Sequence, residues 1–245
     1  MRVALFATCL IDALFPDAGR ATVNILERLG QPVEFPPEQT CCGQMHANSG
    51  YFEPNLVRRY VETFTDYDAI VTPSASCAGA IRHQHVMIAR AAKDDALATA
   101  AQTTADKTYE LSQFLIDVLH TDDVGAYFPH RVTYHPTCHS LRMLKLGDRP
   151  LRLLKKVRGI DLVDLPDDQE CCGFGGTFSI KNPDVSAAML ADKMESVIET
   201  GAEVLCAGDR SCLMHIGGGL ERIRAGVKTL HLAEILASTD RETTN

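Results

Sequence analysis

The sequence predicts an α/β protein built from two tandem Rossmann-like lobes, each with a short parallel sheet, related by a pseudo-twofold axis. Three observations lead to this prediction. Cysteines recur in the same order in the two halves of the 245-residue chain, strand-like and helix-like stretches alternate between them, and each recurring cysteine follows a strand-like stretch or the loop behind one. We expect the lobes to span residues 1–125 and 126–245, with the boundary near Gly125.

The first lobe is expected to begin with a buried strand and to alternate strands with amphipathic helices. The expected strands are residues 3–8, 32–36 and 68–73, and the expected helices are residues 21–30 and 53–64. Residues 109–119 resemble a closing element. The strands lead in turn to Cys9, to the adjacent pair Cys41 and Cys42, and to Cys77.

The second lobe repeats this order. The expected strands are residues 131–137, 161–166 and 202–208, the expected helices are residues 151–159 and 184–201, and the closing element is residues 229–238. The strands lead to Cys138, to the pair Cys171 and Cys172, and to Cys212. The first gap is 32 positions in one half and 33 in the other, and the second gap, counted from the first cysteine of the pair, is 36 and 41. The order of the cysteines therefore repeats, and the first spacing nearly does.

The recurring cysteines are expected to meet at one edge of each sheet, because the carboxyl ends of parallel strands share an edge where ligands bind. Helix N-termini at that edge favour thiolates. Four thiolates select an iron–sulfur cluster or a tetrahedral zinc ion, and the absence of any C-x-x-C knuckle argues against ordinary structural zinc. The predicted metal ligands are Cys9, Cys41, Cys42 and Cys77 in one group and Cys138, Cys171, Cys172 and Cys212 in the other.

Residues close to the second pair are expected to support that site. Gly173, Gly175 and Gly176 form a glycine-rich turn whose N–H groups are predicted to approach a bound cluster. Side chains expected to act as hydrogen-bonding or charged neighbours rather than ligands are His46, His135, His139, Lys181 and His215. The ninth cysteine, Cys206, interrupts an apolar run and is interpreted as a small buried hydrophobic residue.

Composition excludes several classes of function. A net charge of −8 argues against binding to nucleic acid and to anionic lipid, and no apolar run is long enough to span a membrane. Nine cysteines, an odd number, fit metal or redox chemistry in a reducing cytoplasm better than a disulfide framework. The glycines after the second cysteine pair lack the spacing and acidic partner of a dinucleotide-binding fingerprint.

The motifs CCGQ with NSGY, at residues 41–51, and CCGFGGTFS with SCLMHIGG, at residues 171–179 and 211–218, resemble the lactate utilization protein A family. This family belongs to the cysteine-rich CCG-domain proteins, which include the B subunit of heterodisulfide reductase. The resemblance implies an iron–sulfur subunit that oxidises L-lactate to pyruvate with a ferredoxin-like iron–sulfur partner and a third subunit.

The sequence departs from the fuller CCG motif, which ends in C-x-x-C. Ser74 and Asp209 occupy the first of those cysteine positions, so four cysteines for each lobe fit a [4Fe–4S] cluster better than a five-cysteine one, and Asp209 could supply an oxygen ligand. The similar iron–sulfur subunits of glycolate oxidase and anaerobic glycerol-3-phosphate dehydrogenase carry a ferredoxin domain with closely spaced cysteines. This chain has no such segment, which implies that electrons pass to or from another polypeptide.

The sequence alone leaves two alternative functions open. One is a redox subunit that handles thiols and disulfides, as the similarity to heterodisulfide reductase suggests. The other is a scaffold protein that carries zinc in one lobe or both. The second lobe is expected to be the functional cluster site, because it has the glycine-rich turn and more nitrogen-bearing side chains.

Overall fold

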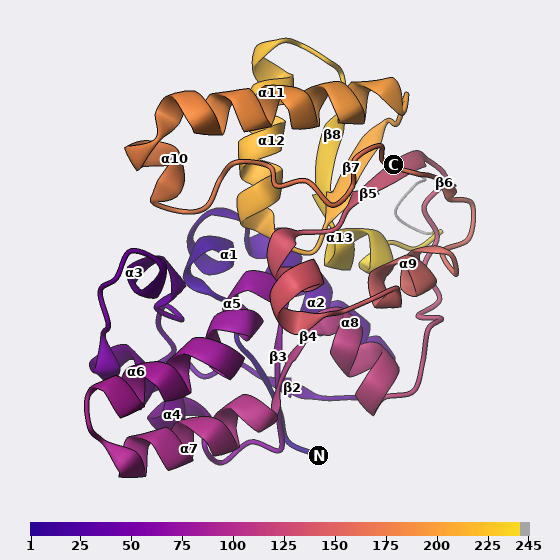
Figure 1. The fold of residues 1–245 in the computed structure, drawn as a ribbon. Coiled ribbons are helices and arrows are strands. Elements are labelled where there is room, and N and C mark those ends of the chain that lie inside the picture. The colour runs from indigo at the N-terminus through magenta and orange to yellow at the C-terminus, as the bar shows by residue number, and fades with distance from the viewer. Residues whose placement is uncertain (241–245) are drawn as a thin grey trace. The chain divides into compact units, whose positions relative to one another are not determined.

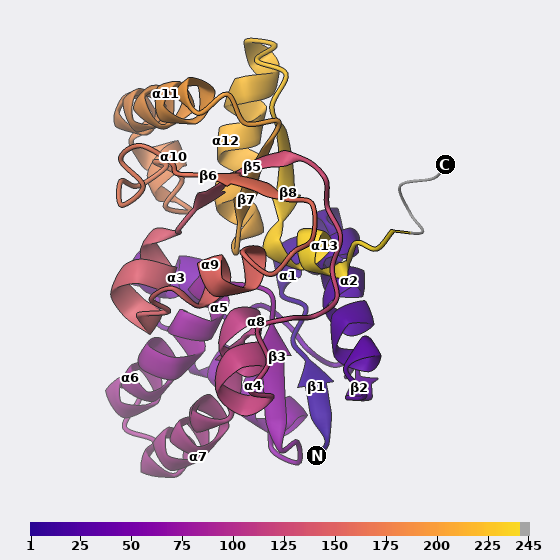
Figure 2. The same ribbon diagram turned by 90° about the vertical axis from the view of Figure 1, so that its right-hand side faces the viewer.

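The computed structural model describes residues 1–240 (Figures 1 and 2). The chain divides into two compact units, the first spanning Met1–Leu119 and the second beginning at His120. The boundary predicted between residues 125 and 126 falls slightly further along the chain. Within the described residues, no helix is long and apolar enough to cross a membrane.

The first unit is organised around a four-stranded sheet in which all neighbouring strands are parallel. The strand order is β2-β1-β3-β4, so the chain moves outward from β1 in both directions. The strands are β1 (Val3–Leu5), β2 (Val33–Glu34), β3 (Ala69–Thr72) and β4 (Thr108–Glu110). The reversal of direction between β1 and β3 creates a topological switch point, where ligands bind in open parallel sheets.

Helices connect these strands as crossovers. They are α1 (Cys9–Leu14), α2 (Pro16–Arg28), α3 (Gln44–Asn48), α4 (Pro54–Phe64), α5 (Ala75–Gly79), α6 (His85–Ala91), α7 (Asp95–Asp106) and α8 (Leu111–Gln113), with π-helical turns η1 (Ala80–Gln84) and η2 (Phe114–Val118). Figure 2 shows α2 on one side of the sheet and α6 and α7 on the other. The core between β1 and α4 is aromatic, because the Phe6 ring packs edge-on against Tyr60 and Phe64 at 5.2 and 5.6 Å.

The second unit repeats this arrangement with a parallel sheet in the order β6-β5-β7-β8. Its strands are β5 (Arg131–His135), β6 (Asp161–Val163), β7 (Val204–Ala207) and β8 (Lys228–His231). Its helices are α9 (Arg149–Leu154), α10 (Phe178–Lys181), α11 (Pro183–Glu199), α12 (Arg210–Arg222) and α13 (Leu232–Ala237), with a π-helical turn η3 (Ser140–Leu144). Buried side chains of α11, α12 and β7 form one core cluster.

These sheets confirm the predicted α/β class with parallel strands in both halves; the pseudo-twofold axis stays a prediction. One expected helix is shorter than its pattern indicated. Residues 151–159 leave the helix after Leu154, because Arg158 pairs with the segment around Tyr127 through backbone hydrogen bonds. The helical pair α6 and α7, which packs on α4, was not assigned from the sequence.

Candidate metal centres

The carboxyl ends of the strands in the first unit bring its four recurring cysteines together. Cys9 is the first residue of α1, just beyond β1, and Cys77 lies in α5, just beyond β3. The pair Cys41 and Cys42 lies in the loop between β2 and α3. Cys9 and Cys77 therefore flank the switch point of the sheet, and the loop after β2 brings the pair to the same place.

Sulfur–sulfur distances show how closely these thiols approach. The Sγ atoms of Cys9 and Cys41 are 3.7 Å apart, and those of Cys42 and Cys77 are 3.2 Å apart. The Cys41 and Cys42 thiols also interact with each other, so the four side chains form one contiguous group. Cys42 and Cys77 are buried, whereas Cys9 is exposed, so the group has a buried end and a solvent-facing end.

Three of these thiols, those of Cys9, Cys41 and Cys42, have shifted pKa values. Hydrogen bonds from Cys42 and Cys9, helped by the Gly43 N–H at 3.4 Å, lower the pKa of Cys41. The bond to Cys41, together with burial, raises the pKa of both Cys9 and Cys42. The pKa of Cys41 is therefore lowered while those of Cys9 and Cys42 are raised, and a cation that binds these sulfurs must displace their protons.

Local backbone structure fixes two of these cysteines. Ser74 is the N-cap of α5, and its hydroxyl oxygen accepts a hydrogen bond from the Cys77 N–H at 3.3 Å. Ser74 therefore holds the turn that carries Cys77. Gly43 follows the cysteine pair with φ of +80°, a left-handed conformation that turns the chain into α3.

The second unit presents the equivalent group at the carboxyl ends of its strands. Cys138 follows β5, the pair Cys171 and Cys172 lies in the loop after β6, and Cys212 is in the first turn of α12, beyond β7. Cys171 interacts with both Cys138 and Cys172, and Cys172 interacts with Cys212, so these four thiols are also contiguous. Hydrogen bonds from Cys138 and Cys172 lower the pKa of Cys171, and the Gly173 N–H, 3.4 Å from its sulfur, adds to the effect.

Asp209 occupies the N-cap position of α12, equivalent to Ser74 before α5. Its side chain is buried and its Oδ2 accepts a hydrogen bond from the Thr137 hydroxyl at 2.8 Å. Asp209 thereby ties the residue before Cys138 to the start of the helix that carries Cys212. The structure gives this carboxylate a bridging role within the site's framework, and its role as an oxygen ligand stays a prediction.

The glycine-rich turn after Cys172 has a backbone that only glycine fits easily. Gly173, Gly175 and Gly176 have φ of +87°, +52° and +65°. The Gly173 carbonyl accepts a hydrogen bond from the Ser186 hydroxyl at 2.9 Å, which ties the turn to α11. The Gly173 N–H faces a cysteine sulfur, and the cofactor-binding role expected of all three glycines stays a prediction.

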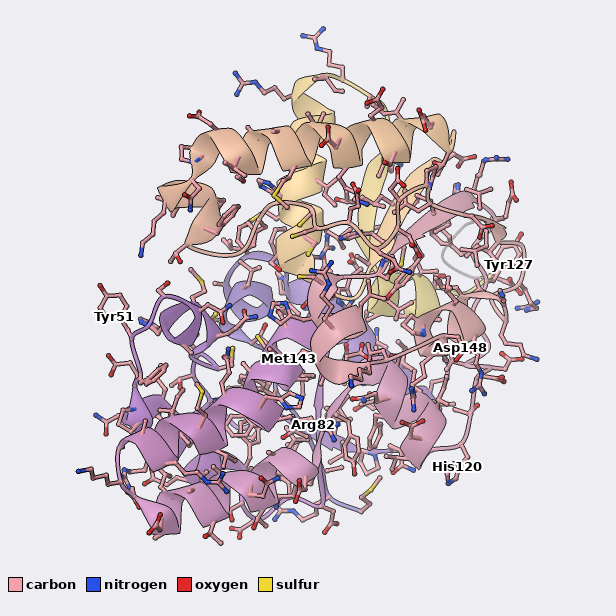
Figure 3. All side chains as sticks on the ribbon, viewed as in Figure 1. Tyr51, Arg82, His120, Tyr127, Met143 and Asp148 are labelled. Carbon is pink, nitrogen blue, oxygen red and sulfur yellow. The ribbon has the colours of Figure 1, made fainter. Side chains whose placement is uncertain are left out.

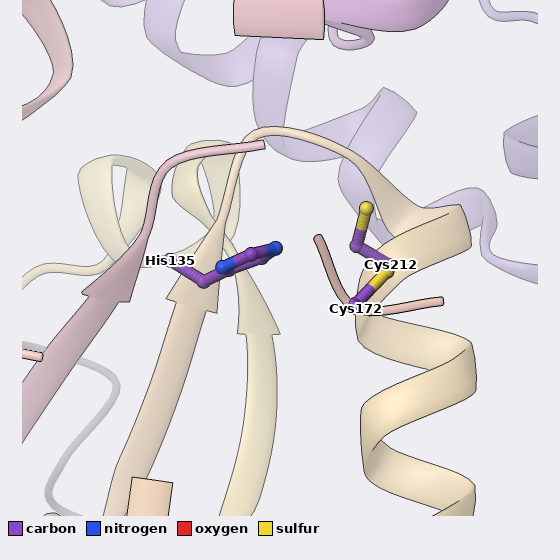
Figure 4. A group of neighbouring side chains, drawn as sticks. All are labelled: His135, Cys172 and Cys212. Atoms are coloured by element: carbon purple, nitrogen blue, oxygen red, sulfur yellow. The ribbon is translucent and has the colours of Figure 1, made fainter. Parts of the chain in front are cut away.

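Three histidines lie around the second group of thiols. His135 is the last residue of β5, and Figure 4 shows its ring directed toward Cys172 and Cys212. One of its ring nitrogens and the two cysteine sulfurs lie within 4.8 Å of one another. His139 Nδ1 is 3.6 Å from the Cys138 sulfur. His215 Nε2 is 3.4 Å from the Ser186 hydroxyl and its ring packs against Phe174.

The structure places the other residues singled out in the sequence as follows. His46 lies in α3 and is exposed, as is Lys181 at the end of α10. Tyr51 of the NSGY motif is 65% exposed, and Figure 3 shows its side chain at the surface. Cys206 is fully buried inside β7, and its electrostatic neighbours are Glu234 and Arg210 rather than the other cysteines.

Two buried polar residues were not anticipated from the sequence. His85 in α6 has its Nε2 2.8 Å from the Cys42 carbonyl oxygen, so the first group also has a histidine behind it. Lys193 in α11 is buried, and its Nζ donates to the Asp167 carbonyl at 2.6 Å. His85 lies 43 positions from Cys42, and Lys193 lies 26 positions from Asp167, so neither motif spacing nor periodicity identifies them.

The donor set in each unit suits a soft metal centre. Four cysteine sulfurs that converge at a sheet edge, with backbone N–H groups directed at one of them, match the ligands of iron–sulfur clusters and of tetrahedral zinc. Burial of the inner sulfurs excludes water from one side of each group.

Comparison with known proteins agrees with this arrangement. The family model described as a cysteine-rich domain, CCG, matches residues 3–82 and 132–217, one match in each unit. The chain is 46% identical over 245 residues to lactate utilization protein A of Oceanobacillus iheyensis, covering 99% of this chain and 98% of that protein. It is 48% identical over 242 residues to lactate utilization protein A of Bacillus cereus strain B4264, covering 97% and 99%.

Among solved structures, a hypothetical protein from Helicobacter pylori superposes with a TM-score of 0.63 at 10% sequence identity, over 96% of this chain. The chain spans about half of that protein, 48% of its length. This likeness supports the fold alone.

Proposed function

We propose, from the premise that the chain belongs to the lactate utilization protein A family and carries two cysteine-rich CCG domains, that it is the iron–sulfur subunit of an enzyme complex that oxidises L-lactate to pyruvate. One observation carries this proposal: each unit gathers four cysteine thiols at the carboxyl edge of a parallel sheet, in the same order along the chain.

The proposed ligands of the first centre are Cys9, Cys41, Cys42 and Cys77, and those of the second are Cys138, Cys171, Cys172 and Cys212. Four thiolates suit a [4Fe–4S] cluster, with zinc in one unit as the alternative. When bound, such a cluster supplies one-electron chemistry. The N–H groups of Gly43 and Gly173 hold Cys41 and Cys171 as acceptors, which favours the thiolate form that a metal requires.

The electrons released by lactate oxidation require partner subunits. Oxidation of a 2-hydroxy acid to a 2-oxo acid releases two electrons and two protons. The two proposed centres would each hold one electron, so an acceptor outside this chain must re-oxidise them before the next turnover. We infer that a ferredoxin-like iron–sulfur subunit and a third subunit complete the complex. We place the complex in the cytoplasm, because all nine cysteines are free and eight of them are gathered as thiols at the two sites.

Reconstitution tests this function. The anaerobically purified chain is mixed with its two proposed partner subunits and L-lactate is added. The loss of visible absorbance that accompanies cluster reduction is then followed. We expect bleaching with L-lactate when all three proteins are present, and much slower bleaching with D-lactate or when one subunit is omitted. Bleaching by a thiol or disulfide couple in place of lactate would instead support a thiol-handling reductase. A colourless chain that contains zinc would support a scaffold.

A further inference from the structure

His135 differs from the other histidines of the second unit because it is buried among the cysteines with a ring nitrogen unused. The residue is 1% exposed, and in the described part of the chain its Nδ1 has no hydrogen-bond partner. Figure 4 shows the ring directed from the end of β5 toward Cys172 and Cys212. A ring nitrogen and the two cysteine sulfurs all lie within 4.8 Å of one another.

The internal repeat shows that packing does not require a histidine at this position. Counted back from the first cysteine of each unit, His135 corresponds to Phe6 in the first unit. Phe6 is fully buried and its ring packs against Tyr60 and Phe64. A purely apolar ring therefore fills this place in one unit, whereas the other unit buries a polar ring beside its thiols. The second unit therefore presents a ring nitrogen beside its thiols where the first unit presents only carbon, and imidazole nitrogen is a donor atom that soft metal centres accept.

We propose that His135 is a ligand of the metal centre in the second unit, which is therefore held by nitrogen and sulfur donors together, whereas the first unit's centre is held by cysteines alone. This inference rests on the proposed function only in that the second site holds a metal. Imidazole is a common partner of thiolate in zinc sites and replaces cysteine in one class of iron–sulfur cluster.

An imidazole binds a metal through the lone pair of one ring nitrogen, and the buried His135 side chain presents a ring nitrogen beside the sulfurs. A neutral ligand also adds no negative charge to a site that already holds thiolates. Histidine ligation raises cluster reduction potentials, so the second centre is expected to be the more easily reduced of the two.

The chain offers two histidines as matched controls. His139 approaches the Cys138 sulfur at 3.6 Å but is only half-buried, and His215 Nε2 is 3.4 Å from the Ser186 hydroxyl. Both carry the same nitrogen atoms within the same unit. If mere proximity of an imidazole produced the expected signal, replacing either of them would change it as much as replacing His135.

Pulsed EPR on protein labelled with ¹⁵N-histidine tests the assignment. The reduced wild-type chain is expected to show a strong hyperfine coupling to a histidine nitrogen. The coupling should disappear in His135→Phe, which copies the first unit, and persist in His139→Phe and His215→Phe. A Cys41→Ser/Cys42→Ser background, in which only the second site can hold a metal, should retain it, and a Cys171→Ser/Cys172→Ser background should lack it. The midpoint potential of the second centre should fall in His135→Phe.

The measurement remains decisive if the variant fails to fold, because absence of a strong histidine coupling in the labelled wild-type protein already overturns the proposal. A coupling that persists in folded His135→Phe also overturns it. If the purified chain contains no iron, the proposed function fails. The histidine assignment is then tested separately by recording the same spectra on Co²⁺-loaded protein. Loss of the histidine coupling in His135→Phe again supports the assignment, and its persistence again overturns it.

Discussion

Serine at both Cys171 and Cys172 is expected to remove the second metal centre and to abolish lactate-dependent electron transfer in the reconstituted complex. The matched change, serine at both Cys41 and Cys42, should empty the first site and leave a measurable part of the activity. Each pair supplies two of the four sulfurs in its group, and a hydroxyl is a poor substitute for a soft thiolate ligand. Iron content and lactate-dependent bleaching of each variant measure the two effects.

The ranking of the two sites follows from the groups around the thiols. The Gly43 and Gly173 N–H groups contact Cys41 and Cys171 at the same distance, 3.4 Å, so this donor does not distinguish the sites. The second site adds His135 beside the inner sulfurs and a histidine ring nitrogen 3.6 Å from Cys138. Nearby donors and charges tune cluster potentials, which favours the second site as the functional one.

The reverse result would contradict this ranking. If the Cys41→Ser/Cys42→Ser protein loses all activity while the Cys171→Ser/Cys172→Ser protein retains it, the first unit holds the functional centre. Circular dichroism of both variants serves as the control for folding. Equal loss of activity in two folded variants would mean that both centres are required and that neither ranks above the other.

Gly173→Ala is expected to destabilise the protein far more than Gly43→Ala, although both glycines follow a cysteine pair. Both have φ near +80°, a conformation that costs an alanine roughly 1–2 kcal/mol. A Cβ at Gly173 would also lie 2.7 Å from the Ser186 carbonyl oxygen, whereas one at Gly43 would be 3.4 Å from the nearest Leu56 atom. Relief of that overlap adds about 1–3 kcal/mol, giving a total of about 2–5 kcal/mol for Gly173→Ala.

Urea denaturation of the metal-free proteins measures this difference without interference from metal loss. The Gly173→Ala midpoint should fall clearly below that of Gly43→Ala, and the Gly43→Ala midpoint should fall only modestly below wild type. Equal midpoints would show that α11 can move away from the glycine-rich turn at little cost. In that case the contact between Gly173 and Ser186 does not fix the turn.

The repeat in the sequence predicted much of this structure because it is carried by local signals. Short strands ending before a cysteine identify both parallel sheets, and the carboxyl-edge rule then brings Cys9, Cys42 and Cys77 together without further information. The ends of helices were harder to predict from the sequence. The chain around Lys155 has a helical pattern, yet it leaves the helix because a distant segment offers backbone hydrogen bonds to Arg158.

Other features could not be predicted because they depend on contacts between distant segments. The sequence singled out His135 from its closeness to Cys138 along the chain, but the position of its ring nitrogen beside Cys172 and Cys212 is visible only in three dimensions. His85 behind Cys42 has no signal in the sequence. The contact from Lys193 to the loop before the second cysteine pair has no signal in the sequence either.

Iron, acid-labile sulfide and zinc, quantified in the chain after anaerobic purification, test the central claim most directly. Two centres of the [4Fe–4S] type predict about eight iron and eight sulfide for each chain, and one cluster with one zinc predicts about half of each. Loss of about half the iron in either cysteine-pair variant would assign the clusters to the two groups of thiols. A wild-type chain with zinc at both sites and no acid-labile sulfide would contradict the account.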